Sequence, residues 1–227
     1  MFIDSGYILL VIPALIFAMY AQSRVRGAFE RYSRHRASSG RTGGEVARDL
    51  LAAARLDDVR IERIGSSLGD HYDPRTRVLR LSPQVYDSAS VAALGVAAHE
   101  VGHAVQHDTG YSPLAVRNAI LPVAQLGSNA AWPLFLIGLV FSLPMLMDLG
   151  ILFFFAAVLF QVVTLPVEYN ASGRAMEMLI SGGYVSASDA GPTKAVLDAA
   201  ALTYVAATAM AVAQLARLLI LRGSRRD

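Results

Sequence analysis

The stretch SASVAALGVAAHEVGHAVQHD occupies residues 88–108 and predicts a single helix. Ser88 and Ser90 are possible N-caps at its start. His99 and His103 are four residues apart, so they lie on one face of this helix about one turn from each other. The stretch therefore presents two imidazoles to the same point in the fold.

The spacing His-Glu-x-x-His at 99–103 lets one helix place two imidazoles on one metal ion. Glu100 flanks such a metal, where it can take a proton from metal-activated water, and Gly102 leaves the helix surface open nearby. The chain has no cysteine, so its ligands must be His, Asp or Glu. Zinc accepts these ligands and keeps a fourth position open. The alternative is a helix that carries two histidines by chance.

A third protein ligand is needed, and two residues are candidates. His107 continues the four-residue spacing, but it lies about 12 Å along the helix from His99, too far to share one zinc. We expect His107 to be solvated near the helix end. Glu168 opens a helical pattern at 166–179, where a carboxylate beside Pro166 is also common at a helix start. Spacing alone does not decide whether Glu168 is the third ligand or only a carboxylate at a helix start.

The composition indicates a membrane protein. Hydrophobic residues make up 54% of the 227 residues, and the mean hydropathy is +0.43. A soluble domain has a lower apolar share. The net charge is +2, with the arginines clustered beside an apolar run. They do not follow an amphipathic face with interleaved aromatics, which argues against a nucleic-acid partner.

Four apolar runs are candidates for membrane helices. Residues 6–22 precede an arginine-rich stretch, the reverse of a signal peptide, so we expect a retained anchor with the arginines in the cytoplasm. The runs at 117–141 and 145–165 predict a hairpin of two spans. The run at 196–221 contains an Asp, a Gln and an Arg, so it is either a fourth span or an interfacial helix.

Short patterned segments precede the helix at 88–108. Residues 45–56 predict an amphipathic helix. Residues 57–64 and 75–82 alternate polar and apolar side chains, as half-buried strands do. Residues 69–74 (GDHYDP) read as a turn-rich connector. Together they predict a small mixed α and β region.

Three segments resemble the bacterial membrane neutral zinc metallopeptidases, the YugP-like family. They are DHYDP (70–74), VLRLSPQVYDSASVAALGVAAHEVGHAVQH (78–107) and LPVEYNAS-x-RA (165–175). The resemblance extends from about residue 57 to 215. This family is similar to the gluzincin peptidases, which pair the His-Glu-x-x-His helix with a glutamate on a later helix. The resemblance implies a Zn²⁺ ion held by His99, His103 and Glu168.

The resemblance also implies supporting residues. Relatives of the CAAX prenyl protease type carry an acid four residues after the ligand glutamate, where this chain has Ser172. Ser172 or Asn170 would hydrogen-bond a ligand histidine, or else only serve the helix start. In zincin-like folds an edge strand beside the active-site helix binds extended substrate, which makes VLRLS (78–82) the expected edge. His71 or Tyr72 would then stabilise the oxyanion, although such turn residues are more often structural.

The expected fold is mainly α and membrane-embedded, with a small zincin-like α+β catalytic unit packed on three or four transmembrane helices. We expect four regions along the chain. They are an N-terminal transmembrane anchor (1–23), a catalytic region with the His-Glu-x-x-His helix (24–112), a transmembrane hairpin (113–166), and a third-ligand helix with a C-terminal apolar helix (167–227).

The resemblance implies a zinc-dependent membrane metallopeptidase that hydrolyses peptide bonds, with Glu100 as its base. The expected partners are a peptide or membrane-protein substrate and the lipid bilayer. The expected location is the bacterial cytoplasmic (inner) membrane, with several spans and a cytoplasmic active site. The alternatives are a zinc hydrolase of a lipid-linked amide and a metal-binding membrane scaffold without catalysis. An intact Glu100 argues against the scaffold, because a structural zinc needs no base.

Overall fold

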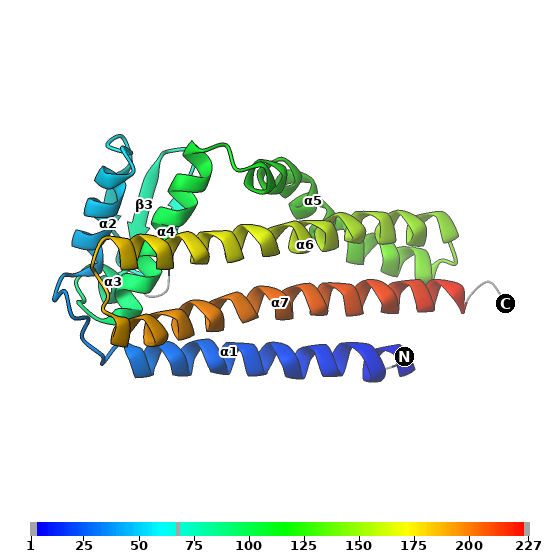
Figure 1. Cartoon of the computed structure of the whole chain (residues 1–227). Helices are drawn as coiled ribbons and strands as arrows, with labels where there is room; N and C mark the ends of the chain where they lie inside the picture. Colours follow the sequence, from blue (N-terminus) through cyan, green and yellow to red (C-terminus); the bar gives the residue numbers. More distant parts are fainter. Residues whose placement is uncertain (1–3, 67–68, 225–227) are drawn as a thin grey trace. The chain divides into compact units, whose positions relative to one another are not determined.

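A computed structural model describes residues 4–66 and 69–224, and Figure 1 shows its elements. This part of the chain is mainly helical with one small sheet, as predicted. Its helices are η1 (Tyr7–Val11, a π-helical turn), α1 (Ile12–Tyr32), α2 (Gly43–Ala53), α3 (Pro83–Tyr86), α4 (Val91–Asp108), α5 (Ser112–Val140), α6 (Pro144–Ser181) and α7 (Ala187–Gly223). Its strands are β1 (Arg60–Arg63), β2 (His71–Asp73) and β3 (Val78–Leu81).

The chain divides into two compact units. The first comprises Met1–Gln22, Pro113–Leu165 and Leu202–Asp227, and the second comprises Ser23–Ser112 and Pro166–Ala201. Helices α1, α6 and α7 each contribute residues to both units. The long helices therefore carry apolar sequence in the first unit and more polar sequence in the second.

Four helices of the described chain are long and apolar enough to cross a membrane. The run at 196–221, left open from the sequence, is part of α7 and is one of them. We predicted a span at 145–165 and a separate helix at 166–179, and this division was wrong, because both belong to α6. Pro166 removes one backbone hydrogen bond, which a packed membrane helix tolerates.

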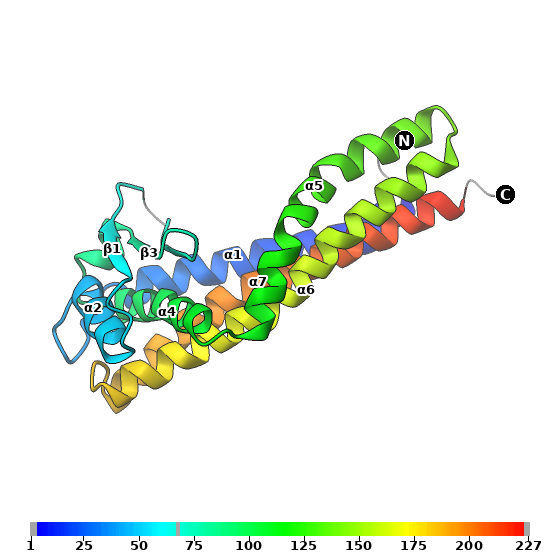
Figure 2. The same ribbon diagram turned by 90° about the horizontal axis from the view of Figure 1, so that it is seen from above.

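Close backbone contact holds α5 against α6 within the first unit, and Figure 2 shows the two helices as a hairpin. A Cβ atom on Gly127 would lie 2.5 Å from the carbonyl oxygen of Phe153. A Cβ atom on Gly150 would lie 2.7 Å from the carbonyl oxygen of Ala131. Small residues of this kind let membrane helices pack backbone to backbone. The predicted hairpin therefore has a physical basis in its glycines.

Two ion pairs join the last part of α7 to Asp4, which precedes η1, and to the beginning of α6. Arg217 Nη2 lies 2.9 Å from Asp4 Oδ2, and Arg222 Nε lies 2.7 Å from Asp148 Oδ1. The Arg217 side chain is only 10% exposed, and a buried guanidinium in an apolar helix needs an acidic partner. Figure 1 accordingly shows the start of α1 beside the end of α7.

The second unit contains a three-stranded sheet in which β3 is central. It pairs in parallel with β1 and antiparallel with β2. The prediction that residues 78–82 form an edge strand was therefore wrong. Residues 71–73, which read as part of a connector, form the edge strand β2 instead. Alternation shows which face of a strand is buried, but it does not show where the strand lies in the sheet.

The core of the second unit fixes the position of α4. Leu79 and Leu81 on β3 are fully buried together with Val46 on α2 and Leu94 on α4. Ser90 caps α4, because its Oγ accepts the N–H of Ala93 at 3.2 Å. Helix α4 is thus held at its start by a cap and along its length by apolar packing.

Candidate metal centre

Three side chains from α4 and α6 converge in the second unit. His99 Nε2 lies 3.2 Å from Glu168 Oε2, and His103 Nε2 lies 3.6 Å from the same oxygen. The three ligand-type atoms lie within 4.8 Å of one another. The side chains are 13%, 12% and 3% exposed, in the order His99, His103 and Glu168. The structure thus brings together the three residues that the sequence analysis assigned to one metal.

The donor set fits a zinc ion. Bonds of about 2.0–2.1 Å in a tetrahedral site place ligand atoms about 3.3 Å apart. The separations from Glu168 Oε2, 3.2 Å and 3.6 Å, are close to that value. Two imidazoles and a carboxylate also match zinc sites that have three protein ligands and one open position.

The second nitrogen of each ring is hydrogen-bonded, which orients the first. His99 Nδ1 lies 3.1 Å from Ser172 Oγ, and His103 Nδ1 lies 3.0 Å from Gln106 Oε1. Because Nδ1 is engaged in both rings, Nε2 is the nitrogen that faces Glu168. Ser172 therefore contacts a histidine, as the resemblance implied.

Gln106 is a residue of this site that the sequence analysis missed. Its side chain is fully buried and donates to the carbonyl oxygen of Val167 at 2.8 Å and to Asn170 Oδ1 at 2.9 Å. Asn170 also accepts a hydrogen bond from Arg174, and it reaches His103 only through Gln106. The available signal was a polar residue one turn after His103 on a helix of mostly small, apolar residues.

Gly102 has a different role from the one expected. It is buried, and a Cβ atom there would lie 2.7 Å from the carbonyl oxygen of Ala171 and 3.2 Å from its Cα. The expectation of an open helix surface at Gly102 was therefore wrong. The missing side chain lets the backbones of α4 and α6 meet beside His103, between Glu168 and Ser172 on the facing helix.

Glu100 lies outside the converging set and points to the edge strand. Its Oε2 accepts the backbone N–H of Tyr72 at 2.9 Å. Tyr72 belongs to β2, and an N–H that binds Glu100 does not also pair with β3. The residue next to His99 thus presents a carboxylate to the free edge of the sheet.

The same tyrosine also binds α4 through its side chain. Tyr72 OH lies 2.9 Å from His107 Nδ1, with ring centroids 5.9 Å apart. We expected His107 to be solvated, but it is half-buried. It lies outside the cluster of His99, His103 and Glu168, as helix geometry requires. Burial raises the pKa of Tyr72 above its ordinary value.

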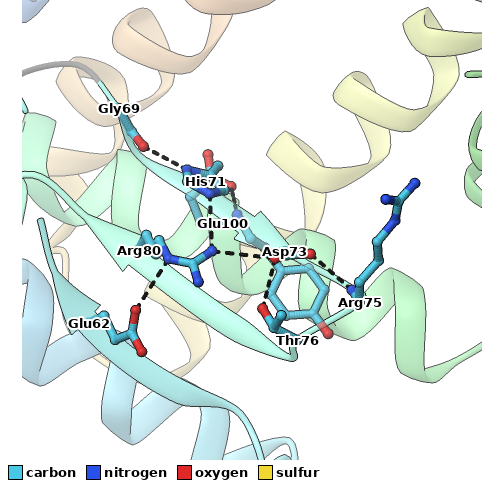
Figure 3. A network of polar contacts seen from close by, with 9 residues as sticks. Glu62, Gly69, His71, Asp73, Arg75, Thr76, Arg80 and Glu100 are labelled. Carbon is cyan, nitrogen blue, oxygen red and sulfur yellow. Dashed lines mark hydrogen bonds and ion pairs between the residues drawn. The ribbon is translucent and has the colours of Figure 1, made fainter.

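His71 belongs to a polar network around Arg80 (Figure 3). His71 Nδ1 donates to the carbonyl oxygen of Gly69 at 2.7 Å, and its Nε2 faces Arg80 Nη1 at 3.4 Å. Arg80 also contacts Glu62 at 3.2 Å and Asp73 at 3.4 Å. Both nitrogens of His71 are therefore engaged. A role for His71 or Tyr72 in stabilising an oxyanion stays a prediction.

The electrostatics of the centre favour a cation. Burial acts to lower the pKa of His103, but the hydrogen bond to Glu168 and the nearby charge of Glu100 outweigh it and raise that pKa. Surroundings that stabilise an imidazolium stabilise a bound metal cation by the same Coulombic attraction. The site thus combines suitable ligands with a suitable charge.

The contact at Gly102 generates a prediction. Gly102→Ala should lower zinc affinity at least tenfold, because the new methyl group must push α6 away from α4 and separate Glu168 from His103. Chelator competition on the purified chain measures this. Gly173→Ala is the matched control, since a Cβ there meets no other atom within 4 Å. Equal zinc affinity in both variants would contradict the role given to Gly102.

Comparison with known proteins gives a consistent result. Residues 7–223 match the family described as "Putative neutral zinc metallopeptidase". The "Putative membrane protease YugP" of Bacillus subtilis (strain 168) is 46% identical over 221 residues, which is 97% of this chain and 98% of that protein. No solved structure matches the chain significantly. The family match includes both helices that form the candidate metal centre, and the chain therefore belongs to this family.

Proposed function

We propose that the chain is a zinc-dependent peptidase that cleaves peptide bonds at a membrane. The observation that carries this proposal is the convergence of His99, His103 and Glu168 with Glu100 left outside the set. A structural zinc takes four protein ligands, whereas a catalytic zinc takes three and leaves one position open. A free carboxylate beside a three-ligand site is the arrangement that hydrolysis needs.

The chemistry follows from these positions. Zinc bound there would polarise the scissile carbonyl and lower the pKa of a water molecule. Glu100 accepts a proton from the attacking water and passes it to the leaving amine. The N–H of Tyr72 holds the Glu100 carboxylate at the strand edge, so the base is in place before substrate binds.

The edge strand favours a peptide substrate. Residues His71, Tyr72 and Asp73 pair with β3 on one side only. The N–H of Tyr72 points away from β3, and the C=O of a strand residue lies on the same side as its N–H. Glu100 already occupies the N–H, so an extended peptide beside Glu100 would bind this edge by donating a backbone N–H to the carbonyl oxygen of Tyr72. We therefore transfer the substrate-binding role from residues 78–82 to β2, and rank a lipid-linked amide second.

We further infer that the metal centre faces the cytoplasm. The residues after the first span include six exposed arginines, and cytoplasmic loops are rich in such residues. They are Arg24, Arg26, Arg31, Arg34, Arg36 and Arg41. The α5–α6 hairpin leaves this side and returns to it, so α4 and the end of α6 share one side. Asp148 and Glu168 are twenty positions apart on α6, about 30 Å at 1.5 Å per residue, which is one hydrocarbon thickness.

The arginines of α7 fit this orientation. A fourth span carries Arg217 and Arg222 toward the outer side, against the usual charge bias. Asp4 and Asp148 neutralise them there. The pairing supports a fourth span as far as Arg217 and Arg222 are concerned, whereas Arg225 and Arg226, which would end on the same side, lie outside the described residues.

Glu100→Gln should retain about one zinc per chain and lose hydrolysis, because the amide cannot accept the proton. Metal analysis and cleavage of a casein-type substrate in detergent, with and without a chelator, measure the two effects. Glu177→Gln is the control, since Glu177 is an exposed residue of α6. A zinc-free Glu100→Gln variant would overturn the assignment of Glu100 as base.

Glu168→Ala should lower zinc affinity far more than His107→Ala does. Glu168 supplies a ligand-type oxygen, whereas His107 lies outside the cluster and its side chain is bonded to Tyr72. Chelator competition on both variants compares them directly. Equal losses would place His107 at the metal and contradict the proposed site.

Single cysteines test the orientation, because the chain has none of its own. Exposed positions Ser33, Met145, Ser188 and Ser224 are suitable. In right-side-out vesicles an impermeant thiol reagent should label Met145→Cys and Ser224→Cys, but not Ser33→Cys or Ser188→Cys before permeabilisation. Labelling at Ser33 or Ser188 would place the metal centre outside. Protection of Ser224 would show that α7 does not span.

A further inference from the structure

The strongest unassigned feature is the side chain of Gln106, which is completely buried next to the metal centre. It makes three hydrogen bonds that join two helices. Its Nε2 donates to the carbonyl oxygen of Val167 and to Asn170 Oδ1 on α6, at 2.8 Å and 2.9 Å. Its Oε1 lies 3.0 Å from His103 Nδ1 on its own helix. A buried polar side chain is costly unless it is hydrogen-bonded, and a fully hydrogen-bonded one fixes the positions of the groups that it joins.

These contacts allow only one orientation of the amide. The carbonyl oxygen of Val167 can only accept a hydrogen bond, so the NH₂ group of Gln106 must face it. The amide oxygen then faces His103, and that oxygen can also only accept. His103 must therefore carry a proton on Nδ1, which leaves the lone pair of its neutral ring on Nε2.

The hydrogen-bond partner of His99 does not determine which ring nitrogen carries the proton. Ser172 Oγ lies 3.1 Å from His99 Nδ1, but a hydroxyl can donate or accept and rotates freely. Gln106 differs from Ser172 in a second respect. It also binds the backbone of Val167, the residue directly before Glu168. One side chain thus contacts a ligand on α4 and the backbone that carries a ligand on α6.

We propose that Gln106 is a positioning residue that prepares the site for zinc by selecting the Nε2-binding form of His103 and setting its distance from Glu168. This inference rests on the proposed zinc site. Its buried hydrogen bonds fix the imidazole of His103 relative to the backbone of α6. Loss of such a partner lowers metal affinity about 10–100-fold in other sites.

The test compares Gln106→Met with Leu179→Ala in the full chain. Methionine has a similar shape but cannot form the three hydrogen bonds. It should lower zinc affinity about 10–100-fold in chelator competition and alter the visible absorption spectrum of the cobalt-substituted protein. Leu179 is fully buried in the same core, so Leu179→Ala should lower the thermal stability of the zinc-free protein and leave zinc affinity within about twofold.

A second variant, Gln106→Asn, keeps an amide that is one methylene too short to reach both helices. It should show the same loss as Gln106→Met, and it serves if the methionine variant does not fold. Unchanged affinity and cobalt spectrum in a folded Gln106 variant overturn the inference. An equal loss of affinity in Leu179→Ala overturns it as well, because the effect would then be general destabilisation.

The two proposals fail in different ways. If the unaltered chain binds no zinc, or binds it equally well after Glu168→Ala, the proposed function fails. If the unaltered chain binds zinc through Glu168 and Gln106→Met binds it equally tightly, only the role of Gln106 fails.

Discussion

The backbone contact between Gly102 and Ala171 is the constraint on which the candidate metal centre depends. The ligand-type atoms come from two helices, and a metal site tolerates errors of only about 0.2 Å in its bonds. A Cβ atom at Gly102 would stand 2.7 Å from the facing carbonyl oxygen, so only glycine permits this approach. The helices are therefore positioned by contact of their backbones, which deform less than side chains do.

Glu168 adds an electrostatic interaction to the close packing of α4 and α6. Its side chain is 3% exposed, and a carboxylate so deeply buried is costly unless it is paired. His99 and His103 supply the pairing, and a metal cation would strengthen it.

Tyr72 fixes the position of the edge strand β2 against α4. β2 has only three residues, too few to hold a position by pairing alone. Tyr72 attaches it to α4 at two points, through its N–H to Glu100 and through its hydroxyl to His107. Glu100 and His107 are two turns apart on one helix, so the side chain of Tyr72 extends along α4. The free edge of the sheet and the proposed base are thus positioned by a single residue.

The sequence by itself determined the local features of this protein. The spacing of His99 and His103 on one helical face, the exclusion of His107, a cap at the start of α4 and the apolar runs all depend on neighbouring residues, and helical periodicity makes them readable. Glu168 was assigned by resemblance to a family and not by spacing, since no local rule links residues on different helices.

Only the tertiary structure decided which elements meet. It placed β3 at the centre of the sheet, β2 at its edge, Gly102 against Ala171, and Gln106 between His103 and Val167. Each of these depends on partners far away in the chain. A glycine or a glutamine looks the same in a sequence whether it faces solvent or another helix, because its role is set by what packs against it.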